Sequence, residues 1–210
     1  MIKPVNKTRI TVILYFSLIL INIYLILFAI NEKNYPWMIW GSVILIISFS
    51  SWIINKYYTK IIPYSLEFLI ISAFIFHLIH GLYDFGRYHF IFNKFTHFYS
   101  SMIFAFIILI SLSIFYELNG NVEVFTYYKI SFDVIVITMA FGVIWEFLEW
   151  ISDMLFDLNS QPGLNDTMFD LLADTLGGIF IALIGFFLIK NGYVKKITNE
   201  LNEKIRKRLQ

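Results

Sequence analysis

The chain has 210 residues, of which 59% are hydrophobic and 15% are charged, and its formal net charge is +1. Because soluble domains usually carry about 25% charged residues, this composition excludes an ordinary soluble protein and indicates an integral membrane protein. The sequence contains no cysteine, which excludes disulfide bonds and thiolate metal sites.

Apolar runs of about 20 residues recur along the chain, and a helix of this length can cross about 30 Å of hydrocarbon. The first run follows a basic start without a small-residue cleavage site, so we interpret it as an uncleaved span rather than a signal peptide. The connections are too short for a separate soluble domain. We therefore predict an all-α fold, a polytopic six-transmembrane-helix bundle, with residues 1–190 as one domain. The predicted spans are 10–30, 36–54, 62–82, 96–116, 131–151 and 168–190.

The basic residues orient this bundle. If the N-terminus is cytoplasmic, thirteen Lys and Arg residues lie in inner segments, whereas only Lys33, Arg87 and Lys94 lie in outer loops. This positive-inside pattern predicts a multi-pass protein of the bacterial cytoplasmic (inner) membrane with both termini in the cytoplasm. The tail, residues 191–210, combines basic residues with an apolar edge and is predicted to lie as an amphipathic helix on the anionic inner leaflet.

Polar residues are distributed unevenly among the first four spans. The first two have no ionisable residue in their interiors and are predicted to be walls that face lipid. The third ends in FHLIHGLYDFGRYH, where His77, His80 and Asp84 share one helical face at i, i+3 and i+7. The fourth opens with NKFTHFYSS, which places His97 and Ser101 one turn apart. A lone histidine at an interface is more often a packing residue than a ligand, but His97 lies opposite several carboxylates.

The fifth span ends in an acidic stripe. Glu146, Glu149 and Asp153 again follow at i, i+3 and i+7. Because residues three apart on a helix project together, a Glu-x-x-Glu pair can offer two carboxylates to one cation. Turn signals, Asn-Ser and Pro-Gly, then indicate a loop over residues 154–165.

The sixth span opens with a second acidic stripe. Asp166, Asp170 and Asp174 follow at i, i+4 and i+8, and Asn165 or Asp166 is expected to cap the helix. The glycine pair 177–178 comes one turn later, where a neighbouring helix can approach closely.

The predicted topology brings these stripes to one side of the membrane. The third and fifth spans end at the outer face, and the fourth and sixth begin there, so the histidines and seven carboxylates share the outer half. Charges in a membrane are costly, so seven close anions require protonation, charged histidines or a bound cation. Oxygen ligands with one or two imidazoles suit Mg²⁺, Mn²⁺, Ca²⁺, Zn²⁺ or Fe. A buried hydrogen-bond network that holds the helices together is the alternative.

A family resemblance accompanies these motifs. WEFLEW, followed by a Q-P-G…D-T-x-x-D-x-x-x-D-x-x-G run and preceded by a histidine in NKFTHF, resembles the YjdF-like family, an uncharacterised family of bacterial inner-membrane proteins. The resemblance covers roughly residues 84–185. It implies a site and supplies no reaction. Its most specific positions are Trp145, Glu146, Glu149, Gln161, Asp166 and Asp170.

Three functions stay open at this point. The first is a divalent-metal-dependent enzyme acting on a membrane lipid or lipid-linked substrate, whose metal activates water or polarises a phosphoryl or carbonyl group. The second is a structural or partner-binding membrane protein, and the third is a cation or proton transporter that uses the same carboxylates. No nucleic-acid partner is predicted. The predicted metal ligands are His97, Glu146, Glu149, Asp166 and Asp170, and the predicted acid/base residues are His80 and Asp174.

Overall fold

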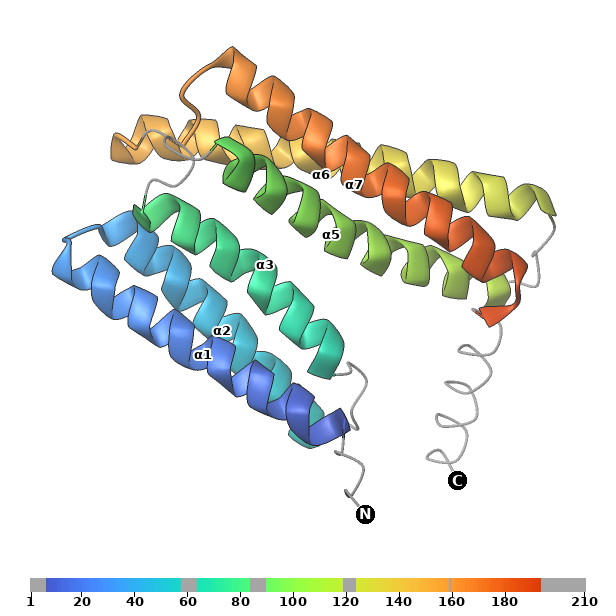
Figure 1. Ribbon diagram of the computed structural model, residues 1–210, viewed down its shortest axis with the longest axis horizontal. Coiled ribbons are helices and arrows are strands. Elements are labelled where there is room, and N and C mark those ends of the chain that lie inside the picture. The colour runs from blue at the N-terminus through green and yellow to red at the C-terminus, as the bar shows by residue number, and fades with distance from the viewer. Residues whose placement is uncertain (1–6, 58–63, 84–89, 119–123, 159, 194–210) are drawn as a thin grey trace. The chain divides into compact units, whose positions relative to one another are not determined.

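The fold is helical throughout the part of the chain that the computed structural model describes, which is residues 7–57, 64–83, 90–118, 124–158 and 160–193. No strand occurs among these residues, so the predicted all-α class is confirmed. Five of the six predicted apolar runs fall within a helix, and the third, 62–82, does so from residue 64 on, where the described residues resume (Figure 1). The helices are α1 (Lys7–Asn31), α2 (Tyr35–Tyr57), α3 (Tyr64–Tyr83), α5 (Phe90–Leu118), α6 (Val124–Phe156) and α7 (Leu164–Lys190).

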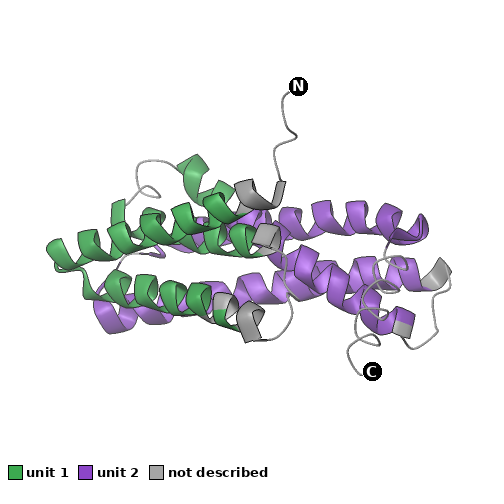
Figure 2. Cartoon of the chain, turned by 90° about the horizontal axis from the view of Figure 1, so that it is seen from below, with its two compact units in different colours: residues 1–96 green, residues 97–210 purple. Residues whose placement is uncertain are grey.

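The contacts divide the chain into two compact units, residues 1–96 and residues 97–210, which Figure 2 colours separately. The first unit contains α1, α2 and α3, and the second contains most of α5 together with α6 and α7. The single domain over residues 1–190 stays a prediction. Most of the tail proposed as an amphipathic helix, residues 194–210, lies outside the described residues.

In the first unit, α1, α2 and α3 pack around one apolar cluster that includes Tyr15, Ile44 and Leu78. Polar side chains also join α1 to α2. The Tyr15 hydroxyl donates to the Ser48 carbonyl at 2.6 Å, and the Asn22 amide donates to the Gly41 carbonyl at 3.2 Å. The predicted lipid-facing walls therefore also bury hydrogen bonds between them.

In the second unit, α7 packs against both α5 and α6. Gly177 lies beside the start of α5 and Gly185 lies beside Leu109 further along it, so α5 and α7 run in the same direction. Gly178 lies beside Thr138 of α6, and α6 runs antiparallel to α7 (Figure 1). The shared core consists of Ala105, Leu109, Ile130, Val134, Ile181, Ala182 and Ile189.

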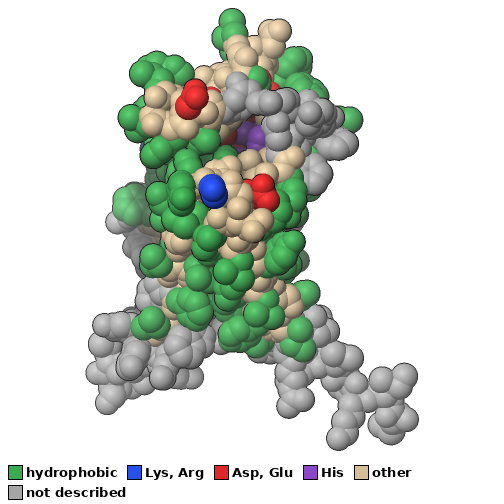
Figure 3. Space-filling view, turned by 90° about the vertical axis from the view of Figure 1, so that its left-hand side faces the viewer, with side chains coloured by type: hydrophobic (Ala, Val, Ile, Leu, Met, Phe, Trp, Pro, Cys, Tyr) green, Lys and Arg blue, Asp and Glu red, His purple; other side chains and the backbone are tan. Residues whose placement is uncertain are grey.

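The outer surfaces of the helices are strongly apolar. Four helical segments, in α1, α5, α6 and α7, are long and apolar enough to cross a membrane, and shorter apolar helices span Tyr35–Phe49 and Glu67–Tyr83. Hydrophobic side chains cover most of the described surface in Figure 3, where charged side chains are few. Because a helix that is apolar on its exposed face cannot be stable in water, this surface indicates contact with lipid.

Candidate metal site at the ends of α5, α6 and α7

Three helices of the second unit deliver buried polar side chains to one place. His97 lies near the start of α5, Glu146 lies near the end of α6, and Asp170 lies near the start of α7; each is almost completely buried. Asp174, one turn further along α7, is also buried. Among the described residues of these three helices, the buried ionisable side chains are these four. The predicted convergence of α5, α6 and α7 is thus observed.

Glycines allow the helices to approach closely enough for this convergence. A Cβ on Gly177 would lie 2.8 Å from the backbone oxygen of Phe98, so α7 lies directly against α5. A Cβ on Gly142 of α6 would lie 2.6 Å from Oδ2 of Asp174. The prediction that a helix approaches closely at Gly177 and Gly178 is confirmed, whereas the contact at Gly142 was not anticipated from the sequence.

One side of the His97 ring faces Asp174. Nδ1 of His97 lies 3.4 Å from Oδ1 and 3.5 Å from Oδ2 of the carboxylate. The Ser101 hydroxyl donates a hydrogen bond of 2.6 Å to Oδ1 of the same carboxylate. Asp174 therefore occupies the Nδ1 side of the ring and is itself held by a neighbour from α5.

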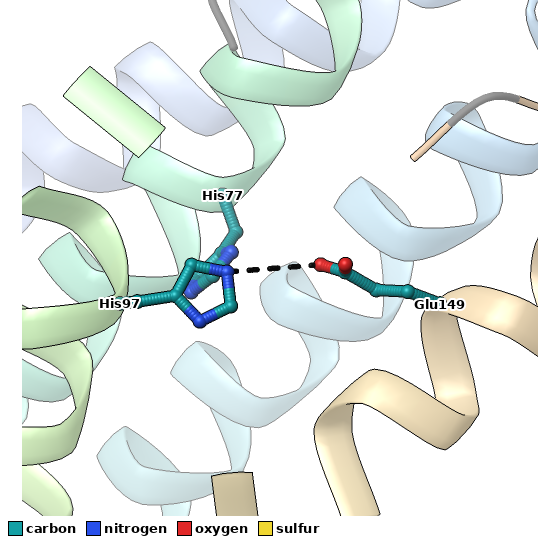
Figure 4. Close-up of side chains that lie close together, drawn as sticks. All are labelled: His77, His97 and Glu149. Carbon is teal, nitrogen blue, oxygen red and sulfur yellow. Dashed lines mark ion pairs between the residues drawn. The ribbon is translucent and has the colours of Figure 1, made fainter. Parts of the chain in front are cut away.

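The opposite side of the ring faces two other carboxylates. Nε2 of His97 lies 3.5 Å from Oδ1 of Asp170 and 4.0 Å from Oε1 of Glu149, the ion pair drawn in Figure 4. One ligand atom from each of His97, Glu146 and Asp170 lies within 4.8 Å of the others. We call these three residues the buried triad.

Glu146 has one oxygen engaged and one without a partner. The Gln161 side-chain amide donates to Oε2 at 3.0 Å. Oε1 is buried and has no hydrogen-bond partner among the described residues. A buried carboxylate oxygen without a donor is costly, because burial removes its water and nothing in the protein replaces it. Because one carboxylate oxygen of Glu146 is among the ligand atoms of the triad, this buried side chain can offer an oxygen to a ligand.

Glu149 and the loop after α6 complete the surroundings. The Trp145 indole donates to Oε1 of Glu149 at 2.8 Å, so this tryptophan, a specific position of the family resemblance, fixes an acidic side chain. Asp153 accepts the backbone N–H groups of Ser160 and Gln161, each at 2.8 Å. These two bonds tie the loop to α6 and place Gln161 beside Glu146.

The distances suit a metal ion. With metal–ligand distances of about 2.0–2.2 Å, tetrahedral ligand atoms lie about 3.3–3.6 Å apart. The 3.5 Å between His97 Nε2 and Asp170 Oδ1 falls in this range, and the ligand atoms of the whole triad lie within 4.8 Å of one another. These buried His, Glu and Asp groups could therefore hold a metal ion.

The remaining predicted site residues are distributed differently. Asp166 lies half-buried in the first turn of α7, one turn before Asp170, and is not part of the triad. His80 lies in the last turn of α3, in the first unit, so its role as an acid/base stays a prediction. Asp84 lies outside the described residues. The predicted cap was wrong, because α7 begins at Leu164 with Gly163 as N-cap and no side-chain cap bond.

The fold and this site define a class, a multi-pass helical membrane protein with a buried His/Glu/Asp cluster. The chain belongs to the family described as "Predicted membrane protein (DUF2238)", whose sequence model matches residues 13–191. A Thermotoga maritima protein described as "Uncharacterized protein" is 32% identical over 142 residues, which is 65% of this chain and 69% of that protein. No solved structure matches. The predicted membership of an uncharacterised membrane-protein family is confirmed, and the name YjdF stays a prediction.

Proposed function

We propose that this protein is a divalent-metal-dependent membrane enzyme whose cation is held by His97, Glu146 and Asp170. Glu149 and Asp166 are proposed as further ligands, and Mg²⁺, Mn²⁺, Ca²⁺, Zn²⁺ or Fe as the ion. The observation that carries the proposal is the buried triad, in which one ligand atom from each side chain lies within 4.8 Å of the others; a buried Glu146 oxygen, Oε1, without a hydrogen-bond partner among the described residues supports it. The proposed substrate is a membrane lipid or a lipid-linked compound.

The local charge balance supports a cation rather than a purely structural network. The acidic groups Glu146, Glu149, Asp170 and Asp174 surround one imidazole, and none of the buried residues that the structure describes is Lys or Arg. Four carboxylates would need more positive charge than one His⁺ supplies, and a hydrogen-bond network would not leave Oε1 of Glu146 without a donor.

The proposed setting is a bundle of six spans with both termini in the cytoplasm of a bacterial cell. Its support is the thirteen-to-three distribution of basic residues together with the six apolar helices. In this orientation the site lies in the outer half of the membrane. A lipid headgroup or a lipid-linked group at the outer leaflet is the chemistry within its reach.

A bound divalent ion would act as a Lewis acid on a phosphoryl or carbonyl oxygen, or would supply a nucleophilic water at neutral pH. The residues of the chain prepare the place for it. Gln161 donates a hydrogen bond to one oxygen of Glu146, and Trp145 donates a hydrogen bond to Glu149. Burial of the triad keeps bulk water away, which strengthens each electrostatic interaction there.

Transport is less well supported. Further along α5, α6 and α7, the buried described residues are apolar side chains such as Leu109 and Val134 together with Ser113, Thr126 and Thr138, none of which is ionisable. A relay for protons or cations needs ionisable or polar groups along its whole length, and the buried ionisable residues described in these helices are confined to one end.

The metal is tested on the full-length protein purified in detergent, with elemental analysis after incubation with each candidate ion and desalting. We expect one bound ion in the wild type. Glu146→Gln and Asp170→Asn should lose more affinity than the about 10–100-fold typical of losing an outer-shell partner. Asp157→Asn is the matched control, because Asp157 is an exposed acid at the end of α6. Folded wild-type protein that retains none of the ions would overturn the proposal.

The enzymatic part is tested in liposomes of bacterial polar lipids that contain the metal-loaded protein. Mass spectrometry of the lipids over time should show a new product with the wild type and with Asp157→Asn, but not with Asp170→Asn. Unchanged lipids with metal-loaded wild type would contradict an enzyme acting on these lipids and would favour a structural role for the metal.

A further inference from the structure

We infer that Asp174 is a positioning residue, which with Ser101 orients the His97 imidazole toward the triad, and that the site therefore selects a first-row transition ion over Mg²⁺ and Ca²⁺. This inference rests on the proposed metal site and deepens it. It replaces the acid/base role predicted for Asp174 with a structural role in ligand geometry.

The first step is the contact between Asp174 and the ring. Both carboxylate oxygens lie 3.4–3.5 Å from Nδ1 of His97, so the carboxylate faces this nitrogen squarely. Asp174 is held by one hydrogen bond and lies close against a glycine of α6. Ser101 donates to Oδ1 at 2.6 Å, and the absence of a side chain at Gly142 provides the space that Oδ2 occupies.

The second step is the protonation pattern that this contact imposes. A carboxylate accepts hydrogen bonds, so Asp174 favours a proton on Nδ1, while a cation bound between Nε2 and the carboxylates that face it would take the place of a proton on that side. The lone pair is then on Nε2, the nitrogen that faces Asp170 and Glu149. A histidine that binds a metal through one nitrogen and a carboxylate through the other is the usual arrangement at metal sites, where the outer partner fixes the ring and raises its basicity.

The third step separates Asp174 from the ligands. Asp170, a triad carboxylate that contacts the ring, lies on the Nε2 side, whereas Asp174 lies on the Nδ1 side. Asp174 contacts Ser101 and the His97 ring, so we assign it to orienting His97 rather than to binding the metal ion. Asp170 and Asp174, one turn apart on α7, therefore have different roles: Asp170 is a proposed metal ligand on one side of the imidazole, and Asp174 orients the ring from the other side.

The fourth step concerns the ion. An oriented, neutral imidazole is a good ligand for Zn²⁺ and Fe²⁺, and Mn²⁺ accepts it together with carboxylates, whereas Mg²⁺ and Ca²⁺ prefer oxygen ligands. Mg²⁺ also keeps several waters and demands near-octahedral geometry. A buried triad containing one fixed imidazole therefore favours Mn²⁺, Fe²⁺ or Zn²⁺.

The experiment uses Co²⁺ as a spectroscopic probe on the full-length protein in detergent. Its visible absorption reports the ligand set, and titration gives the affinity. We expect Asp174→Asn to lower the Co²⁺ affinity about 10–100-fold while one ion still binds at saturation. An asparagine amide that turns its NH₂ toward Nδ1 would move the ring proton to Nε2 and remove the lone pair from the site. An excess of Zn²⁺ or Mn²⁺ should displace Co²⁺, whereas the same excess of Mg²⁺ or Ca²⁺ should not.

Two further variants guard against loss of folding. Ser101→Ala removes the hydroxyl that holds Asp174 and should weaken binding by a smaller factor with a changed Co²⁺ spectrum. Ser131→Ala is the control, since the Ser131 hydroxyl of α6 donates to the Ala182 carbonyl of α7, away from the site. It should leave affinity and spectrum unchanged.

The outcomes distinguish the two proposals. Wild-type protein that binds no transition ion but retains Mg²⁺ or Ca²⁺ overturns this inference and leaves the metal site standing, whereas folded protein that retains none of the ions overturns both. Wild-type affinity and spectrum in both Asp174→Asn and Ser101→Ala, with loss of binding in Asp170→Asn, overturn the positioning role alone. Displacement of Co²⁺ by Mg²⁺ as readily as by Zn²⁺ overturns the ion preference.

Discussion

At the scale of single residues, the site depends on which atom of each side chain is engaged. Glu146 presents one oxygen to Gln161 and leaves the other without a protein donor. His97 presents one nitrogen to Asp174 and the other to Asp170. Both side chains are therefore fixed in orientation by a neighbouring side chain, which is what a preorganised binding site requires.

Gln161 offers a test at this scale. Replacing it with alanine removes the amide that donates to Oε2 of the buried Glu146 carboxylate. Loss of a hydrogen bond to a buried charged group costs about 1–3 kcal/mol, so we expect Gln161→Ala to lower the stability of the metal-free protein by that amount. Reversible unfolding of the detergent-solubilised protein measures it.

The matched control for this variant is Asn31→Ala, which removes an exposed amide–carboxylate bond to Glu32. Exposed substitutions of this kind change stability by less than about 0.5 kcal/mol. Equal stabilities for Gln161→Ala and Asn31→Ala would show that the Gln161–Glu146 bond is not a structural contact.

At the scale of helices, the geometry of the site depends on how closely α7 lies against its neighbours. A Cβ on Gly177 would meet the Phe98 carbonyl oxygen at 2.8 Å, and a backbone atom cannot move away cheaply. We expect Gly177→Ala to push α7 from α5 and to lengthen the bond between Ser101 and Asp174. Overpacking of this kind costs about 1–3 kcal/mol, measured by the same unfolding.

The same variant should weaken Co²⁺ binding even though it changes no polar group, because it moves the carboxylate that orients His97. Leu176→Ala is the control on α7, since Leu176 is exposed on the opposite, lipid-facing surface. Unaltered metal affinity in a destabilised Gly177→Ala protein would mean that helix packing and the site are independent.

Hydrophobic runs and acidic spacings in the sequence were sufficient to predict the six helices, their apolar character and the gathering of acids from α6 and α7 around His97. Spacing places residues on a face, but it does not say which atom meets which. The different contacts of Asp170 and Asp174 with His97 therefore could not be predicted from the sequence. The contacts of Gln161 and Asp153 could not be predicted either, because they depend on the path of an irregular loop. The hydrogen bond from Asn22 to the Gly41 carbonyl could not be predicted either, because a single amide in an apolar run forms no periodic pattern.

At the scale of the whole molecule, the absence of cysteine makes the predicted topology directly testable. A single introduced cysteine is then the only thiol in the chain. Lys33→Cys places it in the turn between α1 and α2, and Tyr193→Cys places it just beyond α7 at an exposed position.

If the positive-inside distribution orients the chain as proposed, a membrane-impermeant maleimide added to intact cells with a permeable outer envelope should label Lys33→Cys and should leave Tyr193→Cys unlabelled until the membrane is opened. Because an even number of spans puts both ends of the bundle on the same side, a third cysteine near the N-terminus, at Asn6, should behave like Tyr193→Cys. Labelling of Tyr193→Cys in intact cells would reverse the orientation, and the site formed by His97, Glu146 and Asp170 would then face the cytoplasmic leaflet and its lipids.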